Sequence, residues 1–134
     1  MTRITGIAIG LMVAVAFIGV HAQQPAQQTG FKRTVLQQGD LSAPGREVVQ
    51  VIAEIQPGAE AGRHTHPGEE ITYVLEGALT LEIQGKPPVV KKAGEVFLIP
   101  AGTVHNARNA GTTVAKALAT YVIEKGKPVS TPVP

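Results

Sequence analysis

The 134-residue sequence contains no cysteine and no tryptophan, and aromatic residues make up only 4% of it. Without cysteine, the chain can form no disulfide bond, thiolate metal site or iron–sulfur cluster, and it has no cysteine nucleophile. The charges nearly balance, since 12 basic and 10 acidic side chains give a net charge of +2. The basic residues also form no dense cluster in the sequence. This balance argues against nucleic-acid binding. The length fits a single domain.

Amphipathic helical periods and internal repeats are lacking after Gly30. Instead, 15 glycines and 10 prolines divide the chain into short segments. In residues 79–84, Leu79, Leu81 and Ile83 alternate with polar side chains, which is typical of a strand with one buried face. Similar β-like segments occupy residues 47–56, 71–76, 95–99 and 114–123. Short strands separated by turns predict an all-β antiparallel sandwich or barrel.

The longest hydrophobic run lies at the N-terminus. Arg3 precedes a 17-residue run, residues 4–20, in which every residue but Thr5 is apolar, and Val20 and Ala22 provide short side chains at a cleavage site after Ala22. This pattern predicts a secretory signal peptide over residues 1–22. The alternative is an uncleaved membrane anchor, since 17 residues lie at the lower edge of a bilayer span. The protein is expected outside the cytoplasm, which means the periplasm if the source is a Gram-negative bacterium.

The remaining domain boundaries follow from composition. Residues 23–30 are polar and Gln-rich, which predicts a flexible leader. Residues 125–134 contain three prolines and no periodic pattern, which predicts a flexible C-terminal tail. The folded β-barrel domain is therefore expected over residues 31–124.

Three histidines stand outside the predicted signal peptide, and all belong to one pattern. His64 and His66 are one residue apart, so on a strand their imidazoles share a face. Glu70 follows a tight Pro-Gly turn that can bring its carboxylate beside them, and His105 lies further along the chain. Three imidazoles and one carboxylate form a mixed nitrogen and oxygen site for a divalent transition metal. The sequence predicts that site from His64, His66, Glu70 and His105.

The segments around these four residues resemble the two motifs of the cupin family. Residues 58–77 carry the pattern G(x)5HxH(x)3E(x)6G, and residues 94–109 carry G(x)5PxG(x)2H(x)3N. The matching positions are Gly58, His64, His66, Glu70, Gly77, Gly94, Pro100, Gly102, His105 and Asn109. The chain is similar to small single-domain, type-2 cupins of the quercetin-dioxygenase-like kind. The resemblance implies a double-stranded β-helix, or jelly-roll, barrel in which the four predicted ligands hold one metal ion.

The cupin family includes dioxygenases, isomerases, lyases, decarboxylases and non-catalytic binding proteins, so fold and ligands do not name a reaction. The first hypothesis is a metal-dependent oxygenase that acts on a small organic substrate, with Glu70 as the candidate general base. The alternatives are a non-redox lyase or isomerase and a non-catalytic metal- or ligand-binding cupin. The ligand set suits one divalent ion of Mn, Fe, Ni, Cu or Zn, and acquisition outside the cytoplasm favours Cu and Zn.

Strand parity gives four candidates for the substrate pocket. Thr72 and Val74 share the parity of Glu70 and are expected beside it. Lys116 and Leu118 join them if their face of the 114–123 segment points inward, where Lys116 would bind an anionic substrate. The alternative is an outward, solvated Lys116, because lysine is rarely buried without a partner.

A homodimer is also expected from the family resemblance. The edge strands and apolar outer faces of a small barrel need cover. Residues 31–38 and 47–55 are the predicted interface strands. The other expected partner is a small-molecule substrate or ligand, and a membrane is involved only if the signal segment stays uncleaved.

Overall fold

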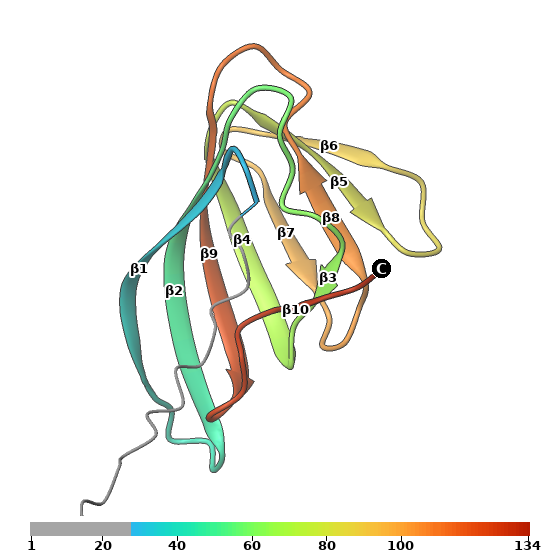
Figure 1. The fold of residues 1–134 in the computed structure, drawn as a ribbon. Helices are drawn as coiled ribbons and strands as arrows, with labels where there is room; N and C mark the ends of the chain where they lie inside the picture. Colours follow the sequence, from blue (N-terminus) through green and yellow to red (C-terminus); the bar gives the residue numbers. More distant parts are fainter. Residues whose placement is uncertain (1–27) are drawn as a thin grey trace, which may run out of the picture.

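The computed structural model describes residues 28–134 and consists of two antiparallel sheets that lie face to face (Figure 1). The strands are β1 (Phe31–Asp40), β2 (Arg46–Ile55), β3 (His64–Thr65), β4 (Gly68–Glu76), β5 (Ala78–Ile83), β6 (Val89–Lys92), β7 (Val96–Ile99), β8 (His105–Arg108), β9 (Ala115–Glu124) and β10 (Thr131–Pro132). Within this range no helix is long and apolar enough to cross a membrane. The predicted signal peptide and most of the predicted leader lie outside the described residues.

The sheets bring together strands that are far apart in the sequence. One sheet has the order β1-β2-β9-β4-β7, and the other has the order β10-β3-β8-β5-β6. Strand β9 runs between β2 and β4 and pairs with both along most of its length. This pairing of distant strands is the jelly-roll arrangement. It confirms the prediction of an all-β antiparallel barrel.

The inward face of the first sheet is defined by alternating side chains on β4 and β9. On β4, Glu70, Thr72 and Val74 are buried, while the residues between them are exposed. On β9, the buried positions are Ala115, Ala117, Ala119, Tyr121 and Ile123. Three of these five β9 side chains are alanines, so the space between the sheets is left open where larger residues would fill it.

The C-terminal segment differs from the flexible tail that composition predicts. Residues Thr131 and Pro132 form β10, which pairs with Thr65 and His64 of β3. The Val129 side chain packs against one apolar core cluster, and the Ser130 hydroxyl accepts a hydrogen bond from Arg33 at 2.8 Å. Prolines fit here because β10 is a short strand at the edge of its sheet.

The strands predicted to form a dimer interface are β1 and β2. Strand β1 is at the edge of its sheet, and Val35 and Leu36 on it are exposed. A second exposed apolar surface lies on the outer side of β4 and β7. Its members are Ile71, Tyr73, Leu75, Val96 and Leu98.

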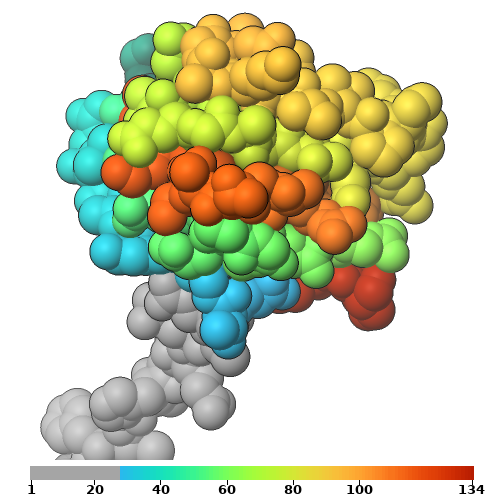
Figure 2. All heavy atoms as spheres, turned by 90° about the horizontal axis from the view of Figure 1, so that it is seen from above, coloured from blue at the N-terminus to red at the C-terminus, as the bar shows by residue number. Residues whose placement is uncertain are grey.

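The loops that follow β2 and β8 close one end of the barrel and are held together by Asn109. They lie side by side across the view from above (Figure 2), where Gly58 N donates to Asn109 O at 2.8 Å. The buried Asn109 amide donates to Ile55 O and Thr113 O, each at 2.8 Å, and its oxygen accepts from Gly111 N at 2.9 Å. Asn109 therefore caps this turn.

Asn109→Ala is expected to lower the free energy of unfolding by about 3 kcal/mol, because three backbone groups would lose their partner inside the protein. Urea denaturation measures this loss. The matched control is Gln84→Ala, since Gln84 is an exposed amide, and its effect should stay within about 0.5 kcal/mol. Equal stability of the two variants would contradict the structural role of Asn109.

Candidate metal centre

Four buried side chains from three strands and one connecting turn converge between the sheets. His64 lies on β3, Glu70 on β4 and His105 on β8, and His66 lies just after β3. The pairing of β3 with β8 places His64 directly opposite His105. One ligand atom from each of the four residues lies within 4.8 Å of the others. The structure thus brings together all four predicted ligands.

Each imidazole is oriented by a backbone carbonyl behind it. The Nδ1 atom of His64 bonds to Gly62 O at 2.7 Å, and Nδ1 of His105 bonds to Thr103 O at 2.9 Å. For His66, the partner is the oxygen of Val129 in the C-terminal segment, at 2.5 Å. A carbonyl oxygen can only accept, so each Nδ1 carries the proton and each neutral ring directs an unprotonated Nε2 into the cluster.

This tautomer makes the short contacts at Glu70 informative. The Nε2 atoms of His66 and His105 lie 2.9 and 3.1 Å from Glu70 Oε2. With neutral rings, these contacts join lone pairs to lone pairs, so they require a cation, either a second proton on an imidazole or a metal ion. Neighbouring ligands of one ion are separated by about 3 Å when its bonds are about 2.1 Å long. The donor set therefore fits a divalent transition metal.

The electrostatics of the cluster favour the metal-binding protonation states. Burial, the largest cause, together with the charges of His105 and His66 lowers the pKa of His64 to about 4, although a hydrogen bond to the backbone of Gly62 opposes them. Burial alone would raise the pKa of Glu70, but its close contacts with His105 and His66 hold it well below its usual range. At neutral pH, His64 is an uncharged nitrogen donor and Glu70 is a carboxylate.

Two further residues support the ligands. Thr72 Oγ1 donates to Glu70 Oε1 at 2.7 Å, which fixes one carboxylate oxygen and leaves Oε2 directed at the imidazoles. The ring of Tyr121 packs against His66 with 4.6 Å between ring centroids. Burial, together with the charge of Glu70, raises the pKa of Tyr121 above its usual value, so its phenol stays protonated.

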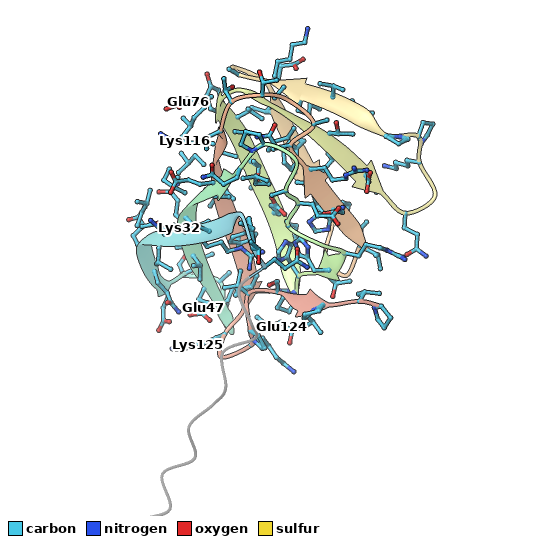
Figure 3. All side chains as sticks on the ribbon, turned by 45° about the horizontal axis from the view of Figure 1, so that its top comes forward. Lys32, Glu47, Glu76, Lys116, Glu124 and Lys125 are labelled. Carbon is cyan, nitrogen blue, oxygen red and sulfur yellow. The ribbon has the colours of Figure 1, made fainter. Side chains whose placement is uncertain are left out.

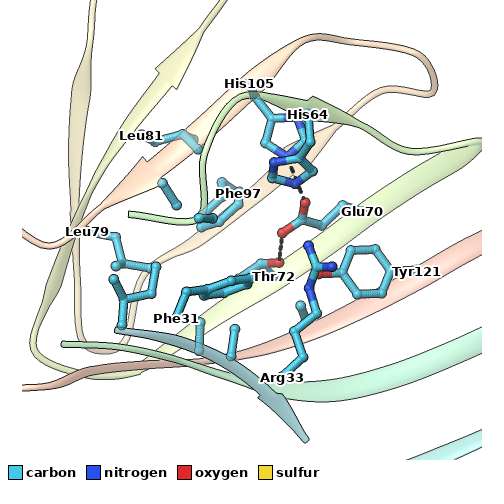
Figure 4. A pocket seen from close by; sticks show the side chains of 16 residues that line it. Phe31, Arg33, His64, Glu70, Thr72, Leu79, Leu81, Phe97, His105 and Tyr121 are labelled. Atoms are coloured by element: carbon cyan, nitrogen blue, oxygen red, sulfur yellow. Dashed lines mark hydrogen bonds and ion pairs between the residues drawn. The ribbon is translucent and has the colours of Figure 1, made fainter. Parts of the chain in front are cut away.

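A pocket between the sheets opens beside the cluster (Figure 4). His64, Glu70 and His105 form its polar end, and Thr72 lies next to Glu70, as predicted. Its apolar walls come from both sheets. They include Phe31, Leu79, Leu81 and Phe97.

Three of the predicted pocket residues lie elsewhere. Val74 has the predicted parity but packs in an apolar core cluster with Ile55. Lys116 and Leu118 are on the outer face of β9, because its alternate alanines face inward. Lys116 Nζ pairs with Glu76 Oε1 at 3.3 Å on this outer side (Figure 3). The expectation that Lys116 and Leu118 line the pocket is therefore wrong.

The residues that the sequence reasoning missed are Phe31 and Arg33 on β1 and Tyr121 on β9. Both β1 residues line the pocket although their strand is at the edge of the sheet. Phe31 and Arg33 share strand parity and flank the exposed Lys32, which is a usable signal for one inward face. Tyr121 shares the parity of the β9 alanines, which was visible in the sequence.

The sheets and the three-histidine, one-carboxylate cluster define a small jelly-roll protein with a candidate site for one metal ion. Residues 51–121 match the family model described as the cupin domain. The chain therefore belongs to the cupin family.

Known proteins agree with this assignment. A Bacillus subtilis protein, YdbB, is 44% identical over 52 residues, which cover 38% of this chain and 46% of that protein. Bovine 3-hydroxyanthranilate 3,4-dioxygenase is 39% identical over 61 residues, which cover 43% of this chain and 21% of that enzyme. The chain thus spans less than half the length of these relatives. A crystal structure of a Klebsiella pneumoniae protein with a double-stranded β-helix domain has a TM-score of 0.63 and 22% identity, covering 78% of this chain and 85% of that one. The similarity to this crystal structure confirms the predicted fold class.

Proposed function

We propose that the protein is a metal-dependent oxygenase that acts on a small organic substrate in the pocket between the sheets. The observation that carries the proposal is the convergence of imidazole Nε2 atoms on Glu70 Oε2, with each Nδ1 committed to a backbone carbonyl. This arrangement calls for a cation. The similarity to bovine 3-hydroxyanthranilate 3,4-dioxygenase favours oxygen chemistry among the reactions that cupins host.

In this function, the three histidines and Glu70 hold the ion, which is Mn, Fe, Ni, Cu or Zn by the chemistry of the donors. A bound transition metal supplies Lewis-acid activation of a substrate oxygen and, where it is redox-active, electron transfer with O₂. Glu70 is also placed to accept a substrate proton on Oε2, because Thr72 holds its other oxygen. The apolar walls exclude water from the reacting groups.

Metal analysis followed by oxygen uptake tests the proposal. The purified protein is expected to hold close to one transition-metal ion per chain and to consume O₂ with at least one of a panel of small organic substrates that includes short β-diketones and carboxylic acids. Turnover that proceeds equally well without O₂ would support a lyase or isomerase instead. Tight ligand binding without any turnover would support a binding protein. A chain that takes up no divalent ion would contradict all three functions.

We also propose that the protein is exported and dimeric. The segment over residues 1–22 supports export, and N-terminal sequencing of protein from the periplasm should then begin at Gln23. The apolar side chains exposed on β1 support an interface between two copies. Light scattering coupled to size exclusion measures the mass, and a monomer at micromolar concentration would contradict the dimer.

A further inference from the structure

Arg33 is a cation placed inside an otherwise largely apolar pocket. It lies on β1 and lines the pocket, and Figure 4 shows its guanidinium beside Tyr121 and directed toward the Glu70 side. Its Cζ atom is 5.0 Å from the centre of the Phe31 ring and 5.9 Å from that of Tyr121. The two rings hold the guanidinium from either side by cation–π contact.

The guanidinium has donors that the protein does not use. One nitrogen, Nη1, donates to Ser130 Oγ at 2.8 Å, and the Tyr121 hydroxyl is a further partner. The buried Nε has no hydrogen-bond partner among the described residues. No salt bridge in residues 28–134 joins Arg33 to a carboxylate, although the chain pairs several exposed lysines in this way. A buried donor without a hydrogen-bond partner is costly, so Nε favours a ligand that can accept a hydrogen bond.

The charge balance of the pocket points the same way. Its polar end contains one carboxylate, Glu70, whereas a divalent ion at the proposed centre and Arg33 together bring three positive charges. An occupied pocket would therefore carry a positive excess. A bound monoanion reduces this excess, and a carboxylate matches the planar fork of the guanidinium.

We propose that Arg33 binds the carboxylate of the substrate, which is a short-chain carboxylic acid. This inference rests on the proposed metal function, since it names the substrate class for the same pocket. The apolar walls receive the carbon chain, and the Nε side of Arg33 receives the carboxylate. The cavity volume of about 30 Å³ is small, with room for two or three water-sized groups. The preferred ligand is therefore a carboxylate with few carbons attached.

The chain offers a matched control beside Arg33. Lys32 precedes it on β1, points to the other side of the strand and is exposed. Lys32→Met and Arg33→Met each remove one positive charge and keep an unbranched apolar side chain. Only Arg33→Met removes the guanidinium from the pocket. Both variants should keep the metal content of the unmodified protein.

The experiment titrates the full chain with sodium acetate or with acetamide, its uncharged analogue, at constant ionic strength. Arginine Nε–H signals in ¹H–¹⁵N NMR spectra report binding in both metal-free and zinc-loaded protein. Acetate should shift the Arg33 signal and saturate, and acetamide should bind at least tenfold more weakly. The Arg33→Met variant lacks the Arg33 Nε–H signal. In this variant, the backbone amide signals of the pocket residues report the binding of acetate. Arg33→Met should weaken acetate binding about 10- to 100-fold, and Lys32→Met should change it less than twofold.

Two failures can be told apart. If zinc does not bind but acetate still shifts Arg33 in the metal-free protein, the proposed metal function fails and the anion site stands. If acetate leaves the Arg33 signal unmoved, or if Arg33→Met and Lys32→Met bind acetate equally, the carboxylate role of Arg33 is overturned whatever the metal content.

Discussion

Glu70→Gln protein is expected to contain almost no transition metal after purification. The substitution keeps the size and shape of the side chain but removes the negative charge and one oxygen donor from a buried cluster. Changing a residue that merely supports a ligand costs about 10- to 100-fold in metal affinity, so loss of the ligand itself should exceed about 100-fold. Mass spectrometry of bound metal and competition with a chelator measure the change.

The neighbouring carboxylate provides the control. Glu69 precedes Glu70 on β4 but points to solvent, so Glu69→Gln makes the same chemical change outside the cluster. Its metal content should equal that of the unmodified protein. Equal metal loss in both variants would mean that net charge, and not ligation, governs binding. Full retention of metal by Glu70→Gln would remove Glu70 from the ligand set.

Gly68→Ala is expected to destabilise the fold by about 3 kcal/mol or more. A Cβ atom at this position would lie 1.9 Å from Val122 O and 2.6 Å from Ile123 Cα, which are main-chain atoms of β9. Backbone atoms cannot rotate away as side chains do, so β4 and β9 must separate where they pair. Denaturant unfolding of chelator-treated protein measures this loss separately from any effect of the metal.

Gly39→Ala is the matched control, since Gly39 lies on β1 and an added Cβ would meet nothing within 4 Å. Its stability should change by no more than about 0.5 kcal/mol. The displaced start of β4 should also weaken metal binding in Gly68→Ala, because Glu70 is two residues further along that strand. A Gly68→Ala protein as stable as Gly39→Ala would contradict the close approach of the two strands.

The local features of the site were predictable because they depend on spacing. The single residue between His64 and His66 and the tight turn before Glu70 are short-range facts of geometry. The glycines at 58, 77, 94 and 102 stand at fixed positions of the two cupin motifs, and all four have positive φ. His105 was joined to the other ligands by the small number of histidines and by the family resemblance, since nothing local brings β8 opposite β3.

The pocket was harder to predict because strand parity gives two faces without saying which one is inside. Parity leaves the segment with Lys116 and Leu118 open between an inward and an outward orientation, although the other face of β9 consists of three alanines, a tyrosine and an isoleucine. An all-apolar face of small residues fits a crowded interior better than a lysine does. The shared parity of Phe31 and Arg33 indicates one inward face of β1, but it does not show that this face lines the pocket, because an arginine between exposed neighbours is usually on the surface.

The contacts of the C-terminal segment determine when the site is complete. Val129, which orients the His66 ring, follows it by 63 residues, and the contact of Ser130 with Arg33 spans 97 residues. Contacts between such distant residues form late in folding. A chain still emerging from the ribosome holds His64, His66 and Glu70 long before Val129 is made. We therefore expect the protein to select its metal ion only after the barrel has folded. Truncation before Val129 should weaken metal affinity even though every ligand is still present.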